Sequence, residues 1–253
     1  YNSVMAASPV PSTSYFALSL APRYSVLFAL PLLIVYEALA ALLAGDDGGI
    51  RNGADVLLRS IFTAVIGRDG SLLFIAVVIL VGIWYVARDL KRSRGSLRPS
   101  IFCAMFAESV VVALAFGIVV GTLTAKLLGS VHLLAIGQIE QSGWATRLML
   151  SLGAGLYEEL LFRVLLVSAL AAGARVLLGV QGRLAGVLAT VVGAIVFSAF
   201  HYIGPYGDPL ELPSFIFRTV AGLAFSGLYV TRGFGVTAWT HALYDVFLLA
   251  ARV

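Results

Sequence analysis

Long apolar runs recur along the chain and are separated by short polar or charged segments. A helix that crosses a membrane needs about 20 mostly apolar residues, so each run can supply one crossing. The apolar positions are continuous rather than alternating, which excludes a closed β-barrel. The sequence therefore predicts an all-α fold, a polytopic transmembrane helical bundle of about seven to eight spans. The runs cover residues 24–44, 71–87, 100–128, 145–172, 184–203, 213–230 and 235–252.

The segment from Gly45 to Arg68 departs from this pattern. It carries charged residues at both ends and apolar residues at helical spacing in between. Such a segment is typical of a helix that lies in the membrane interface with one apolar face. We predict a short amphipathic surface helix near residues 50–66.

The composition agrees with a membrane protein. The chain has 253 residues, of which 60% are apolar and 12% are charged, and its mean hydropathy is +0.98. Soluble domains are about half apolar and a quarter charged. A single cysteine excludes an intrachain disulfide and a cysteine-based metal cluster.

The net charge of +4 could indicate a nucleic-acid partner, but its distribution does not. The densest basic run, residues 88–98, lies between two apolar runs, as cytoplasmic loops do, and no basic face is interleaved with aromatic residues. If every run crosses once, Arg175, Arg183 and Arg232 fall on the same side. We therefore predict no nucleic-acid partner, a cytoplasmic N-terminus and, from the Ala, Gly, Val and Arg bias, an integral protein of a bacterial cytoplasmic membrane.

Ionisable residues inside spans are costly and indicate functional sites. In the segment LYEELLFRVLL, Glu159 and Arg163 are four residues apart, so they share a helix face and can pair. Glu158 lies about 100° round the helix from Glu159 and is left without that partner. A carboxylate of this kind suits a general base or acid. The structural alternative is a buried ion pair that joins helices, with Glu158 bonded to a neighbouring group.

Two further segments place histidines within apolar runs. FSAFHYIG contains Phe197 and His201, and WTHALYDVF contains His241 and Asp245, each pair four residues apart. A carboxylate one turn from a histidine commonly orients its imidazole, which serves catalysis, metal binding or packing. Each histidine alone has a structural explanation. Three separate spans with Glu or His at membrane depth, and nothing comparable in the first half, together indicate one functional site.

The order of these motifs resembles that of the CPBP family of intramembrane glutamic endopeptidases. That family includes the CAAX prenyl endopeptidases and the bacteriocin-processing and immunity proteins. The resemblance covers roughly residues 145–250, and the first 140 residues carry no family signature. The motifs stand here as Glu158-Glu159-x-x-x-Arg163, Phe197-x-x-x-His201 and His241-x-x-x-Asp245.

The resemblance implies an intramembrane endopeptidase that needs no metal or other cofactor. Glu158 matches the glutamate that activates a water for attack on the scissile carbonyl. His201 matches the histidine that helps to hold and polarise that water. His241 and Asp245 match the pair that stabilises the oxyanion, and the second motif makes Phe197 a candidate substrate contact.

The resemblance also implies that Glu159 and Arg163 form a pair that supports the site. Asp245 stands where many family members have Asn. An ionised aspartate cannot donate a hydrogen bond to an oxyanion. We therefore expect Asp245 to orient His241 or to be protonated.

The same reasoning divides the chain into an N-terminal tail (1–22), N-terminal transmembrane helices (23–142) and a catalytic transmembrane core (143–253), all within one integral membrane domain. Apolar spans around the site suit a membrane-associated or lipid-modified protein or peptide as substrate. In a bacterium, a leader, a sorting tail or another membrane protein is a more natural substrate than a prenylated CAAX sequence.

Three alternatives remain open at this level. A zinc peptidase could use Glu158, His201 and His241 as ligands, although the usual H-E-x-x-H spacing is absent. A proton- or ion-coupled transporter could use the same residues as a relay, but transporters usually show paired halves. A non-catalytic membrane scaffold or immunity protein is the third.

The positions predicted for the three motifs across the membrane do not agree with one site. Glu158 and His201 lie towards the non-cytoplasmic side, whereas His241 enters its run from the cytoplasmic side. The three can meet if the final segment is kinked or re-entrant, or if Glu158 lies in the middle of its helix.

Overall fold

The computed structural model describes residues 14–45, 49–93, 96–129, 142–180, 182–204 and 207–251. These residues are all-α, and no strand occurs among them. The helices are α1 (Tyr15–Leu20), α2 (Pro22–Leu42), α3 (Gly53–Ile66), α4 (Gly70–Arg92), α5 (Pro99–Leu128), α6 (Trp144–Gly153), the π-helix η2 (Ala154–Val167), α7 (Ser168–Leu177), α8 (Gly182–Phe200) and α9 (Leu212–Ala250).

Six helical segments in the described residues are long and apolar enough to cross a membrane. The prediction was about seven to eight spans, and the difference arises at α9, which holds the last two predicted runs and counts as one segment. This helix has 39 residues but breaks at Gly233, whose φ of 76° lies outside the helical region. At 1.5 Å per residue, an unbroken helix of this length would be about twice as long as the hydrocarbon core is thick.

Local sequence explains several helix boundaries. Proline opens α2 and α5, where its missing N–H costs no hydrogen bond. Asn52 caps α3 through its side chain, and α5 ends at Gly129 in the left-handed conformation. The predicted amphipathic segment is thus a helix, α3. One face of it is buried through Ala54, Asp55 and Leu58, and it packs on α4 and η2.

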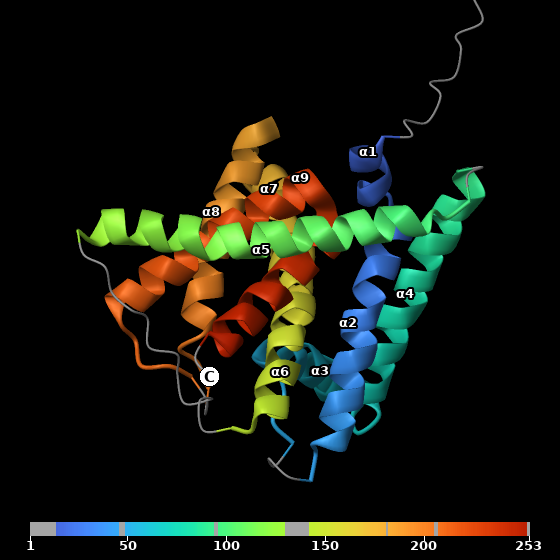
Figure 1. The fold of residues 1–253 in the computed structure, drawn as a ribbon, viewed down its shortest axis with the longest axis horizontal. Coiled ribbons are helices and arrows are strands. Elements are labelled where there is room, and N and C mark those ends of the chain that lie inside the picture. Colours follow the sequence, from blue (N-terminus) through green and yellow to red (C-terminus); the bar gives the residue numbers. More distant parts are fainter. Residues whose placement is uncertain are drawn as a thin grey trace, which may run out of the picture.

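Helix α9 lies at the centre of the bundle and contacts α2, α5, α6, α8 and η2. In Figure 1, α2 and α4 run side by side and α5 crosses them at a steep angle. One apolar core joins α2, α3, α4, α6, η2 and α9 around Tyr36, Met149 and Tyr157. A second joins α5 and α9 around Phe116 and Phe225, whose rings stack at 4.1 Å.

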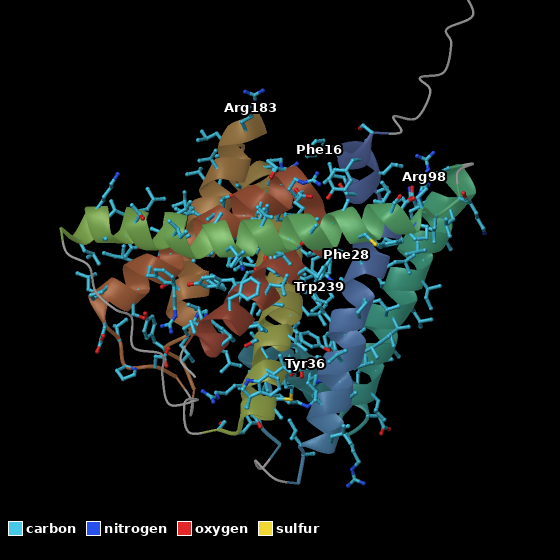
Figure 2. The ribbon with its side chains drawn as sticks, viewed as in Figure 1. Phe16, Phe28, Tyr36, Arg98, Arg183 and Trp239 are labelled. Carbon is cyan, nitrogen blue, oxygen red and sulfur yellow. The ribbon has the colours of Figure 1, made fainter. Side chains whose placement is uncertain are left out.

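Two arginines from separate segments lie at the same end of the bundle. Figure 2 shows Arg98 and Arg183 at the same end of the molecule and Tyr36 in the opposite half. The Lys/Arg pattern requires those two arginines to share one side of a membrane. A cytoplasmic location for that end, and so for the N-terminus, stays a prediction.

The close approach of η2 to α9 depends on glycine. A Cβ at Gly155 would lie 2.3 Å from the Ala238 carbonyl oxygen and 2.7 Å from Ala242 Cβ. We expect Gly155→Ala to destabilise the fold by about 1–3 kcal/mol, because both neighbours belong to a packed helix. Unfolding in mixed detergent micelles measures this, with Gly173→Ala as the matched control, since a Cβ there meets nothing within 4 Å. Equal stability of the two variants would contradict the packing argument.

Candidate active site

The two glutamates on η2 point to different partners. Both are buried: Glu158 is 7% exposed and Glu159 is fully enclosed. Glu159 Oε1 lies 3.1 Å from Arg163 and 2.7 Å from His241 Nδ1. Glu158 Oε1 instead accepts a hydrogen bond of 2.9 Å from Asn52 Nδ2. The expected separation of one paired and one remaining carboxylate is present, although the segment is wound as a π-helix rather than an α-helix.

Arg163 is enclosed by aromatic rings as well as by its ion pair. Its guanidinium lies 4.4 Å from the Phe197 ring centre and 5.4 Å from that of Phe225. It also donates to the carbonyl oxygen of Gly222 at 3.4 Å. Cation–π contacts of this kind are strongest in desolvated surroundings. These contacts fix the position of Arg163 and hence of Glu159.

His201 lies one residue beyond the end of α8 and faces Glu158. Its Nδ1 is 2.8 Å from the Phe197 carbonyl oxygen, and its Nε2 is 3.8 Å from Glu158 Oε2. The Phe197 carbonyl oxygen and the Glu158 carboxylate therefore face opposite nitrogens of the His201 ring.

The ring of His241 is held by residues other than the one that the sequence indicated. Its Nδ1 is bonded to Glu159, and its ring stacks on Phe225 with centres 4.3 Å apart. Asp245, expected to orient this ring, lies farther away, with Oδ2 3.8 Å from Nε2. The ring is therefore fixed by the hydrogen bond that its Nδ1–H donates to Glu159, and Asp245 faces the opposite nitrogen, Nε2.

The motifs meet in space despite their different predicted depths. Glu158 interacts electrostatically with both His201 and His241. Glu158 lies near the middle of the continuous helical stretch Trp144–Leu177, and α9 breaks at Gly233, eight positions before His241. Both features that could reconcile the depths are thus present.

Phe197, the candidate substrate contact, is 3% exposed. Its ring packs against Phe162, His201 and Arg163, and its carbonyl oxygen fixes the tautomer of His201. The observed contacts are with the site itself, and a role in substrate binding stays a prediction.

Sequence reasoning missed two residues of the site, Asn52 and Phe225. Asn52 could be recognised as a helix cap, since an asparagine precedes the α3 pattern, but nothing local links it to Glu158. Phe225 lies on an apolar face of α9, where a ring that packs between Arg163 and His241 looks like any core residue.

Three other charged residues within spans, Glu37, Glu108 and Arg218, form ion pairs. Glu108 binds Arg232 at 2.5 Å, and Glu37 binds Arg59 at 2.5 Å. Arg218 pairs with Asp208. Pairing of this kind is the structural explanation for charges at membrane depth.

Within the described ranges, no three His, Cys, Asp or Glu side chains are grouped closely enough to hold a metal ion.

Comparison with known proteins identifies the second half of the chain. Residues 140–247 match the family model described as type II CAAX prenyl endopeptidase Rce1-like. These residues form a domain of that family. Membership implies a membrane protease that acts on a membrane peptide or protein. No curated protein and no solved structure matches the chain.

Proposed function

We propose that the protein is an intramembrane endopeptidase in which Glu158 activates a water for hydrolysis of a peptide bond. The observation that carries this proposal is the state of the two Glu158 oxygens. Oε1 is bonded to Asn52, whereas Oε2 is buried, has no hydrogen-bond partner among the described residues and faces His201. A buried carboxylate oxygen without a donor is expensive in a purely structural role.

The tautomer of His201 supports the same reading. The Phe197 carbonyl oxygen can only accept, so His201 Nδ1 carries a hydrogen, and Nε2 is an acceptor when the ring is neutral. Two acceptors, Nε2 and Glu158 Oε2, then face each other 3.8 Å apart. A water can donate one hydrogen to each of them, and contacts beyond 3.5 Å are often bridged in this way.

A water held by both hydrogens presents its lone pairs to a carbonyl carbon. As its oxygen forms the new C–O bond, Glu158 takes one proton and the carbonyl oxygen becomes an oxyanion. When the C–N bond breaks, the protonated Glu158 gives that proton to the leaving amine. The products are a carboxyl group and a free amine, and no acyl-enzyme is needed.

The oxyanion requires donors, and His241 is the proposed source. Its Nδ1 is bonded to Glu159, so Nε2 is the atom that can donate when the ring is protonated. Asp245 lies beside Nε2 and can donate to an oxyanion only if it is itself protonated. Glu159 and Arg163 act through His241 by fixing its ring.

A comparison of protein termini in membranes tests this function. Cells with the wild-type chain and cells with Glu158→Gln are compared for termini that appear only when the protease is active. We expect a defined set of termini, from membrane-associated or lipid-modified proteins, to disappear in the variant, because glutamine cannot take the proton from water. Variant levels in the membrane must match the wild type.

An unchanged set of termini would refute the proposal and favour a transporter or a non-catalytic membrane protein. Cleavage should also persist after exhaustive chelation. Loss on chelation and recovery with Zn²⁺ would instead favour a zinc peptidase that uses Glu158, His201 and His241.

A further inference from the structure

Asn52 lies 106 positions from Glu158 in the chain and outside the matched family domain, yet the two side chains are in contact. It is 7% exposed and stands at the end of the connection between α2 and α3. Its Nδ2 donates to Glu158 Oε1 at 2.9 Å, and its Oδ1 accepts from the Ala54 backbone N–H at 2.9 Å. One side chain thus caps a helix and binds the proposed base.

The helix cap decides which way the Asn52 amide faces. The Ala54 N–H can only donate, so the atom beside it must be Oδ1, and the NH₂ group must face Glu158. An amide NH₂ bonded to a carboxylate stabilises its ionised form and fixes its plane. With Oε1 held in this way, Oε2 is the oxygen that faces His201.

A buried network prevents Asn52 from moving away. Its backbone N–H donates to the Tyr36 hydroxyl at 3.1 Å, and that hydroxyl donates to Asp55 at 2.9 Å. Asp55 is fully enclosed and bonded to Arg51 at 2.8 Å and to Arg59 at 2.5 Å. In this series of hydrogen bonds, each donor is matched to an acceptor, and such fully satisfied buried networks are rigid.

The same network also holds the residue next to Glu158. Tyr157 donates to Glu37 at 2.6 Å, and Glu37 binds Arg59 at 2.5 Å. Glu158 is therefore fixed twice, through its own carboxylate by Asn52 and through the neighbouring position of η2 by Glu37. Both attachments come from α2 and α3, in the part of the chain that precedes the family domain.

We propose that Asn52 is a positioning residue of the active site, which holds Glu158 Oε1 so that Oε2 is presented to water and His201. Asn52, at the start of α3, is then a functional part of the site. This inference rests on the proposed function only in taking Glu158 as the base, because the contact itself can be tested without a substrate.

Two variants of Asn52 remove its hydrogen bond to Glu158 and keep its role as a helix cap. Serine and aspartate are both good N-caps, so Asn52→Ser and Asn52→Asp keep the bond to Ala54 N. Serine is too short to reach Glu158, and aspartate replaces the donor by a second carboxylate. Ser60→Ala, an exposed change on the same helix, is the matched control.

The readout is the infrared C=O band of the protonated Glu158 carboxyl group, followed against pH in purified, detergent-solubilised protein. The band is assigned by its loss in Glu158→Gln. We expect it to appear at higher pH in Asn52→Ser, and at a pH about one unit or more higher in Asn52→Asp, because like charges oppose ionisation. Ser60→Ala should titrate as the wild type does.

Thermal unfolding identifies any variant that fails to fold. In that case Tyr36→Phe, which keeps the Asn52 side chain but removes the acceptor of its backbone N–H, should shift the band in the same direction by a smaller amount. Unchanged titration in all folded variants would overturn the proposal.

Cleavage assays distinguish this failure from failure of the proposed function. If Glu158→Gln is inactive while Asn52→Ser has wild-type titration and wild-type cleavage, Asn52 is not a positioning residue and the function stands. If Glu158→Gln retains cleavage, the proposed function fails, and the infrared shift alone then reports whether Asn52 holds Glu158.

Discussion

Glu158→Gln and His201→Asn are each expected to slow peptide-bond hydrolysis by about 10²–10⁴-fold, and the double variant is expected to be no slower than the slower single variant. The two side chains face each other across 3.8 Å as acceptors for one water. Removing either acceptor releases that water, so little remains for the second replacement to remove. Groups that act as a unit are non-additive for this reason.

The measurement is kcat/KM on a quenched fluorescent peptide copied from a cleavage site found by the comparison of termini. His201→Asn keeps a polar side chain of similar size near the Phe197 carbonyl oxygen, and thermal unfolding controls for misfolding. Losses that multiply in the double variant would show that Glu158 and His201 act in separate steps. That outcome would remove the shared water from the mechanism.

The parts of the site that the sequence predicted are local in the chain. Glu159 and Arg163 are four residues apart on one helix, and their ion pair follows from helix geometry even though η2 is wound more widely than an α-helix. Apolar runs predicted where helices lie for the same reason, since periodicity is a local property. The occurrence of Glu or His in three separate spans predicted one site, and the family resemblance suggested the role of each residue.

The parts that the sequence did not predict depend on distant residues. His241 has a carboxylate four residues away, but its hydrogen bond goes to Glu159, 82 positions earlier. Asn52 reaches Glu158 from the other half of the chain. Only packing of α3 and α9 against η2 brings these atoms together, and a single sequence carries no record of that packing.

Those contacts also indicate that the N-terminal half of the chain contributes to the site. The division at residue 143 separates the motif-bearing helices from the rest, and it stays a proposal. Yet α2 and α3 supply the network that fixes Asn52 and Tyr157. A fragment beginning near residue 143 would lack the groups that hold Glu158, so the motifs alone do not make the site.

Arg163→Met is expected to destabilise the fold by about 3–5 kcal/mol, because it leaves the charge of Glu159 buried without its cation. Arg163 is 2% exposed and Glu159 is fully enclosed, so water cannot replace the lost partner. Unfolding in mixed detergent micelles measures the effect. Arg175→Met is the matched control. Arg175 is an exposed helical arginine that donates a hydrogen bond to the Ala171 carbonyl oxygen, and its replacement should cost less than about 0.5 kcal/mol.

The double variant Glu159→Gln/Arg163→Met separates stability from catalysis. A neutral glutamine removes the buried charge, so much of the lost stability should return. Its amide oxygen can still accept from His241 Nδ1, but it cannot stabilise a protonated ring as a carboxylate does. We therefore expect a folded protein whose kcat remains low. Full recovery of both stability and kcat would show that Glu159 and Arg163 only join helices, and wild-type stability of Arg163→Met would show that the buried pair is not needed to compensate Glu159.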